Sequence, residues 1–270
     1  MVAPVAIHGG RVVLFAEERG AGSAVVLVHA GVADHRMWDP QMPWLAEIHH
    51  VIRYDQRGFG RSPHVAGPLS YTEDLFALMD ALGVSRATLV GCSFGGGTVL
   101  HAAAMHSERV ERLVLVGAGV SGYQARAPRE PIFDQIEEAY AARDFDRALD
   151  LEEQAWVVGV RRVPAAVPAE VRALAREMNR TKFAYEDTSV EYLDGRASDV
   201  DALPTLDIPL LVVVGDQDCA DVRETADFLV GACPSATLAV IPDAAHLPSL
   251  EKPSEFNRIL ADWLRSTRGR

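Results

Sequence analysis

A serine between two glycines is the stretch of this chain best suited to chemistry. Residues Gly91 to Gly95 read Gly-Cys-Ser-Phe-Gly, directly after the apolar run Ala87 to Val90 and before a helical pattern. A strand, a sharp turn and a helix in this order are typical of a nucleophile elbow. Such a turn strains the serine backbone by roughly 1–3 kcal/mol, and the glycines remove side chains that would collide there. The stretch predicts a nucleophilic Ser93, against the alternative of an ordinary Gly/Ser turn.

A nucleophilic serine needs a base within hydrogen-bond reach and an acid that orients this base. In elbow proteins the chain order is serine, acid, histidine. Three of the nine histidines follow Ser93, and two of them, His101 and His106, lie on the helix that the elbow starts. His246 follows an apolar run and precedes the last amphipathic segment. We therefore predict His246 as the base, against the alternative of a surface-loop histidine.

Two carboxylates are candidates for the acid. Asp216 and Asp218 follow the apolar run Leu210 to Gly215. Residues two apart in an extended chain point the same way, so the spacing does not choose between them. Either carboxylate could instead cap a turn or the next helix.

Acyl transfer also needs hydrogen-bond donors for the developing oxyanion, each worth roughly 3–4 kcal/mol. We expect one donor in the backbone N–H of Phe94, at the start of a helix whose dipole favours negative charge. The second is assigned by position to the N–H of Gly31, in the loop after Val25 to His29. His29 itself is expected to buttress this loop rather than to take part in catalysis.

Continuous apolar runs alternate with segments of helical periodicity, which indicates strands buried on both faces of a sheet. The apolar runs are Val12 to Ala16, Val25 to His29, His50 to Tyr54, Thr88 to Gly91, Leu113 to Gly117, Leu210 to Gly215 and Thr237 to Ile241. The helical segments are Asp39 to Ile48, Ser70 to Leu82, Phe94 to His106, Val222 to Ala232 and Pro253 to Ser266. This alternation predicts a mostly parallel sheet with helices on both sides, and a hairpin over Val5 to Arg19 adds antiparallel strands at one edge.

The alternation stops between Ser121 and Leu206, where no good strand is found and Ala, Glu, Arg and Asp are frequent. We predict that residues 121–206 form an inserted helical cap and that residues 1–120 and 207–270 form the core. The predicted cap helices are Pro131 to Ala142, Phe145 to Val158, Pro168 to Asn179 and Thr188 to Leu193.

Five motifs together resemble the α/β-hydrolase family over nearly the whole chain. They are His29 to Gly31, Arg53 to Ser62, Gly91 to Gly96, Gly215 to Asp218, and Ala245 to Pro248 followed by Glu251 to Pro253. The resemblance implies an eight-stranded, mostly parallel α/β-hydrolase sheet flanked by helices. The family's acid matches the second aspartate, which selects Asp218 and leaves Asp216 as the fallback. Met37 to Gln41 and Ile52 to Ser62 look like 3-oxoadipate enol-lactonases, with metal-free haloperoxidases and esterases as near relatives.

The expected function is hydrolysis of a carboxylic ester or an enol-lactone-like small molecule through an acyl-enzyme on Ser93. One alternative is a carbon-carbon bond hydrolase that uses the same three residues on a vinylogous diketone. Another is a receptor-like protein that keeps the pocket for ligand binding. The mechanism requires no cofactor and no metal. The residues expected to contact substrate are Val32, Tyr123, Trp156, Arg161 and Leu247.

Composition supports small-molecule chemistry. The 270 residues are 49% hydrophobic and 24% charged, as in one globular domain with an insertion. A net charge of -12 argues against nucleic-acid and anionic membrane partners. Three scattered cysteines predict neither a disulfide framework nor a metal site. No signal-peptide pattern and no apolar run of about 18–20 residues is found, so we expect a cytoplasmic protein. The sequence leaves a homo-oligomer open.

Overall fold

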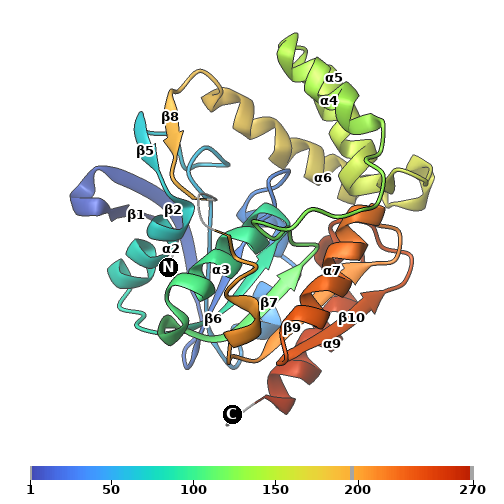
Figure 1. Cartoon of the computed structure of the whole chain (residues 1–270). Coiled ribbons are helices and arrows are strands. Elements are labelled where there is room, and N and C mark those ends of the chain that lie inside the picture. The colour runs from blue at the N-terminus through green and yellow to red at the C-terminus, as the bar shows by residue number, and fades with distance from the viewer. Residues whose placement is uncertain (1, 195–197, 268–270) are drawn as a thin grey trace.

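An eight-stranded sheet forms the centre of the molecule in the computed structural model, which describes residues 2–194 and 198–267 (Figure 1). The strand order is β1-β2-β4-β3-β6-β7-β9-β10. β1 pairs with β2 and β2 with β4 in antiparallel fashion, and the other neighbours are parallel. The strands are β1 (Val2–Ile7), β2 (Val12–Arg19), β3 (Ala24–Val28), β4 (His50–Tyr54), β6 (Ala87–Cys92), β7 (Val110–Val116), β9 (Leu210–Gly215) and β10 (Ala236–Ile241). The predicted sheet is confirmed.

Helices cover both faces of this sheet (Figure 1). The longer ones outside the predicted cap are α2 (Tyr71–Ala81), α3 (Phe94–Met105), α7 (Ala220–Ala232) and α9 (Pro253–Ser266), and the shorter ones are α1 (Met42–Leu45) and α8 (Pro248–Glu251). The 3-10 turns are His8–Gly10, His35–Trp38, Ser107–Arg109, Pro164–Ala166, Thr181–Tyr185 and Leu203–Thr205. Within the described ranges, no helix has the length and apolar character that a membrane span requires.

The predicted helix over Asp39 to Ile48 is wrong. The structure has only a 3-10 turn, His35–Trp38, and the single turn α1 in this region. Pro40 and Pro43 lack the backbone N–H that a continuous helix would use, which explains why the segment breaks into short turns.

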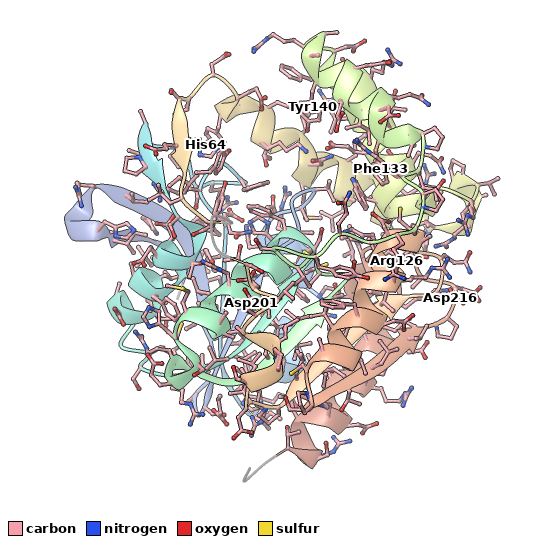
Figure 2. All side chains as sticks on the ribbon, in the orientation of Figure 1. His64, Arg126, Phe133, Tyr140, Asp201 and Asp216 are labelled. Carbon is pink, nitrogen blue, oxygen red and sulfur yellow. The ribbon has the colours of Figure 1, made fainter. Side chains whose placement is uncertain are left out.

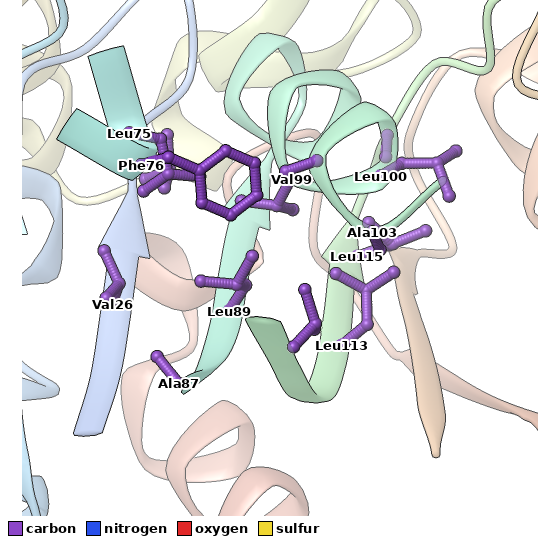
Figure 3. Packing of buried hydrophobic residues seen from close by; sticks show 14 of the residues in the cluster. Val26, Leu75, Phe76, Ala87, Leu89, Val99, Leu100, Ala103, Leu113 and Leu115 are labelled. Carbon is purple, nitrogen blue, oxygen red and sulfur yellow. The ribbon is translucent and has the colours of Figure 1, made fainter. Parts of the chain in front are cut away.

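The central strands β3 and β9 are apolar along their whole length because alternate residues enter different hydrophobic layers. Leu113 and Leu115 of β7 face one layer, and Val114 and Val116 face the other. In the first layer α2 and α3 pack against β3, β6 and β7; the labelled side chains include Val26, Leu75, Phe76, Leu89, Val99 and Leu113 (Figure 3). In the second layer Trp38 contacts Phe256 of α9, with ring centroids 6.2 Å apart.

The segment between β7 and β9 contains most of the remaining elements. They are α4 (Ile132–Ala141), α5 (Phe145–Glu152), a π-helix (Glu153–Gly159), α6 (Ala169–Arg180) and the short strand β8 (Val190–Tyr192). β7 and β9 are nevertheless neighbours, with Leu113 opposite Leu210, so the sheet is continuous across this segment. We propose that residues 121–206 are a cap on the core formed by residues 1–120 and 207–270.

Two predictions for residues 121–206 are wrong. We predicted that this segment contains no strand and that Thr188 to Leu193 form a helix, but the structure has the strand β8 there. β8 pairs in parallel with β5 (Gly67–Leu69) in a separate two-stranded sheet, with Leu69 opposite Tyr192. The ring of Tyr192 also stacks on that of Tyr71, with centroids 6.3 Å apart. A partner strand more than a hundred positions away determines this conformation, and local periodicity cannot reveal such a partner.

Candidate active site

Ser93 lies at a sharp turn between β6 and α3. Its φ of 53° and ψ of -114° are strained for a residue with a side chain. A Cβ on Gly95 would lie 2.4 Å from the carbonyl oxygen of His29, and one on Gly91 would lie 2.3 Å from that of Gly95. Both positions therefore require glycine, and the chain has the elbow geometry that the sequence predicts.

The side chains of Ser93, His246 and Asp218 form a continuous hydrogen-bonded relay. Ser93 Oγ lies 2.7 Å from His246 Nε2, and His246 Nδ1 lies 2.8 Å from Asp218 Oδ2. The other carboxylate oxygen of Asp218 accepts the N–H of Cys219 at 2.8 Å. His246 and Asp218 are both buried, so the carboxylate can fix the orientation of the imidazole with little competition from water.

The structure separates the two aspartates that spacing left equivalent. Asp218 bonds to His246, whereas the Asp216 carboxylate accepts a hydrogen bond from the side chain of Gln217 at 3.1 Å. Asp216 lies near the right-hand edge of the molecule in Figure 2. The chain turns after β9, where the N–H of Asp218 bonds to the carbonyl of Gly215 at 3.2 Å. In a turn, side chains two residues apart no longer point to the same side of the chain, so Asp216 and Asp218 have different partners.

Gly117, at the end of β7, lies against the His246–Asp218 pair. A Cβ on Gly117 would lie 3.1 Å from His246 Nδ1 and 3.3 Å from Asp218 Oδ2. Its φ of +54° also disfavours other residues. The end of β7 therefore packs directly against the hydrogen-bonded pair of His246 and Asp218.

The two backbone donors expected for an oxyanion belong to neighbouring residues. Phe94 is the first residue of α3, and a Cβ on Gly31 would lie 3.4 Å from Phe94 Cβ. His29 braces this loop, because its ring bonds to the carbonyl of Ala30 at 2.8 Å and accepts the N–H of Gln56 at 3.0 Å. Complete burial lowers the pKa of His29, so its ring stays neutral in both contacts.

Residues of the proposed cap contact the loop that carries His246. The ring of Trp156, on the π-helix, lies 4.5 Å from the His246 ring between centroids. Trp156 also packs on Phe133 of α4, at 4.8 Å; Figure 2 shows Phe133 and Tyr140 on the helical hairpin above the sheet. π-Helical turns are frequent at functional sites.

Ser93 and His246 open into a cavity of about 530 Å³. The residues that line it are Tyr71, Thr72, Ser93, Phe94, Gly97, Thr98, His101, Gly117, Gly119, Val120, Ser121, Trp156, Asp194, Asp199, Val222 and His246. The sequence did not indicate four of these polar residues as part of the site: Thr72, His101, Asp194 and Asp199. The helical period after the elbow contains a signal for His101, because positions 94, 97, 98 and 101 lie on one face of α3.

Of the five residues predicted to contact substrate, only Trp156 lines this cavity. Val32 and Leu247 are buried in a hydrophobic layer instead. Tyr123 stacks on Phe228 at 3.8 Å and lines a neighbouring cavity of about 690 Å³. The side chain of Arg161 is 64% exposed and pairs with Glu130 at 3.1 Å, and Arg161 is not among the residues that line either cavity.

One cluster in the described part of the chain has the spacing of a metal site, and its members are Asp34, His35 and Asp55. Their atoms already have protein partners. His35 Nδ1 lies 2.6 Å from Asp55 Oδ1, and Asp34 bonds to Arg36. Burial acts to raise the pKa of Asp55, but the hydrogen bond and charge of His35 outweigh it and hold this pKa below its usual range. The cluster anchors the loop after β3.

Comparison with known proteins identifies the family. Residues 23–253 match the model of the alpha/beta hydrolase fold, and the chain belongs to this family. It is 31% identical to 2-hydroxymuconate semialdehyde hydrolase of Pseudomonas sp. strain CF600, over 92% of this chain and 88% of that protein. It is 25% identical to 3-oxoadipate enol-lactonase 1 of Acinetobacter baylyi, over 90% and 89%. A thermophilic esterase from Thermogutta terrifontis superposes with a TM-score of 0.79 at 25% identity over 99% of both chains. The expected family is confirmed, and the chain is a hydrolase.

Proposed function

We propose that this hydrolase cleaves a carboxylic ester or lactone of a small molecule through an acyl-enzyme. The observation that supports this proposal most directly is the hydrogen-bonded relay of Ser93, His246 and Asp218 at the wall of the 530 Å³ cavity. An esterase and an enol-lactonase among the similar proteins support the same chemistry.

In the proposed reaction, Ser93 Oγ attacks the carbonyl carbon while its proton passes to His246 Nε2. Asp218 stabilises the imidazolium that forms, and the N–H groups of Gly31 and Phe94 bind the oxyanion. Collapse of this intermediate breaks the ester bond, and the leaving oxygen takes the proton from His246. Water then loses a proton to His246, attacks the acyl-enzyme and releases the carboxylic acid. Ser93 regains its proton.

We propose that Trp156 contacts substrate as well as the catalytic histidine, because its ring lies on His246 and lines the cavity. Tyr123, from the neighbouring cavity, is proposed to contact only the larger substrates that extend past Trp156, which lines both cavities.

A second candidate function is hydrolysis of a carbon-carbon bond in a vinylogous diketone by the same three residues. The observation in its favour is the 31% identity to a protein named 2-hydroxymuconate semialdehyde hydrolase. In this reaction, water adds to the ketone carbon as His246 takes one of its protons. The carbon–carbon bond then breaks, a carboxylic acid forms, and the leaving carbanion takes the proton from His246. The two functions differ in which substrates give turnover.

The test compares wild type with Ser93→Ala on short p-nitrophenyl esters, simple lactones and a vinylogous diketone. We expect ester or lactone turnover by wild type and a loss of about 10⁴-fold or more in the variant. Ser107→Ala, at an exposed serine, is the matched control and should keep the wild-type rate. Equal rates for wild type and Ser93→Ala would contradict a mechanism in which Ser93 is the nucleophile. Turnover of the diketone alone would favour the second function, and saturable binding without turnover would favour a receptor.

A further inference from the structure

The cavity wall contains a second histidine–aspartate pair. His101 Nδ1 lies 2.7 Å from Asp199 Oδ1, close to the 2.8 Å that separates His246 from Asp218. The two pairs line one cavity. The His101 side chain is 14% exposed and that of Asp199 is 3% exposed. The mechanism proposed above makes no use of this second pair.

The second pair lies at a distance from the reacting serine. His101 is eight residues after Ser93 along α3, which corresponds to about 12 Å along the helix axis. Gly97 lies one turn from each and lines the cavity without a side chain. The pair can therefore contact the end of a substrate remote from the scissile carbonyl, while Ser93 reaches the carbonyl itself.

The His101–Asp199 contact determines what the ring offers to a ligand. A carboxylate accepts hydrogen bonds, so Nδ1 of His101 is the donor in this contact. When the ring is neutral, Nε2 then carries a lone pair and accepts a hydrogen bond. Because Asp199 also bonds through its N–H to the carbonyl of Ser121 at 2.9 Å, the pair is held in place.

The same wall has a buried hydroxyl without a partner. Thr72 is 4% exposed, lines the cavity, and its Oγ1 has no hydrogen-bond partner in the structure. Buried polar atoms rarely lack partners, and leaving one unsatisfied costs free energy that a ligand can recover. Beside it, the Asp194 carboxylate accepts hydrogen bonds from Ser70 Oγ and from the N–H of Tyr71, each at 2.5 Å. The wall is thus rich in acceptors.

We propose that His101, Thr72 and the adjoining carboxylates bind a hydrogen-bond-donating group, a hydroxyl or an ammonium, at the end of the substrate remote from the bond that is cleaved. This inference rests on the proposed esterase function and names its substrate class. His101 is a specificity-determining residue, and Asp199 positions it.

The experiment uses two series of esters that differ only in a terminal group: methyl, hydroxyl, ammonium or carboxylate. In one series the group ends the six-carbon or eight-carbon acyl chain of a p-nitrophenyl ester, and in the other it ends the alcohol of a butyrate ester. In at least one series we expect wild type to prefer hydroxyl or ammonium over methyl by about tenfold in kcat/KM, the effect of one net hydrogen bond. The carboxylate should be the poorest substrate.

Substitutions then assign the preference to this wall. His101→Leu should reduce the hydroxyl-to-methyl ratio of kcat/KM to about one, and Thr72→Val, of the same shape, should reduce this ratio in part. His106→Leu is the matched control, because His106 ends the same helix, is 46% exposed and is not among the residues that line the cavity. If His101→Leu fails to fold, Thr72→Val and Asp199→Asn carry the test.

The outcomes separate this inference from the proposed function. Ser93-dependent hydrolysis of the methyl-ended esters tests the esterase function by itself. If wild type hydrolyses them but shows no end-group preference in either series, the inference is wrong and the esterase function stands. A hydroxyl preference that survives in both His101→Leu and Thr72→Val would also overturn it.

Discussion

Arg162 and Glu251 join the proposed cap to the loop that carries His246. The guanidinium lies 2.6 Å from Glu251 Oε1, and Glu251 Oε2 accepts the N–H of Ala245 at 2.8 Å. Ala245 directly precedes His246. The side chains are 11% and 3% exposed, so the pair is shielded from water. The proposed cap thus contacts the loop that carries His246, the proposed base, as well as the cavity.

We predict that Arg162→Met leaves the Glu251 carboxylate buried without its partner. Loss of one member of a buried pair typically costs about 3–5 kcal/mol, so the free energy of unfolding should fall by this order. Because the His246 loop loosens, kcat should fall more than KM changes. Arg161→Met is the control, since Arg161 pairs with Glu130 on the surface. Equal effects of the two substitutions on unfolding and kcat would contradict this role.

We predict that Asp218→Asn slows ester hydrolysis by about 10⁴-fold, because an amide favours the wrong tautomer of His246. Asp216→Asn should change kcat little, since that carboxylate bonds to Gln217. Both variants are compared by kcat on one p-nitrophenyl ester. A larger loss at position 216 would move the acid to that residue.

We predict that Gly117→Ala lowers kcat without preventing substrate binding. The added methyl group would lie 3.1 Å from His246 Nδ1, and the positive φ adds strain. Gly231→Ala, in α7, adds the same methyl group where nothing lies within 4 Å, and should leave kcat unchanged. Steady-state kinetics of the two variants on one ester decides the matter, and identical kcat values would refute the steric explanation.

We predict that stability falls as the pH drops below about 6.5, the ordinary pKa of histidine. Burial lowers the pKa of His29, and burial together with Arg57 lowers that of His64. The unfolded chain therefore binds protons that the folded chain does not, so this stability is present above 6.5 and is lost as pH falls. Each histidine contributes a slope of at most about 1.4 kcal/mol per pH unit.

Urea unfolding between pH 8 and pH 5.5 measures this dependence. His29→Gln should flatten the slope, although it also lowers stability at pH 8 because the bonds to Ala30 and Gln56 are lost. The exposed His106 supplies the control variant His106→Gln, which should keep the wild-type slope. A slope that His29→Gln leaves unchanged would show that another group binds the protons.

The elbow and the sheet were predictable because they depend on local rules. Glycine at 91 is required by contacts with Gly95 and Val99 in the turns that follow it, and continuous apolar runs follow from burial on both faces. β8 was not predictable, since its conformation depends on pairing with β5.

The site was predictable only in part, for a related reason. The order of the chain indicated Ser93 and His246, but the choice between two aspartates depends on a turn after β9 that spacing does not reveal. His101 was set aside as a residue of the elbow helix. Its partner Asp199 is 98 positions away along the chain, so only the folded structure brings the pair together.

The pairing of β7 with β9 across residues 121–206 also determines when, during synthesis, the three residues of the relay can come together. Leu113 and Leu210 pair although they are 97 positions apart, and contacts of this range form late in folding. During synthesis the N-terminal part leaves the ribosome first, so Ser93 is made well before β9 and β10 bring Asp218 and His246. An unfinished chain therefore holds the proposed nucleophile without the proposed base, and we expect hydrolysis to begin only when the last strands have joined the sheet.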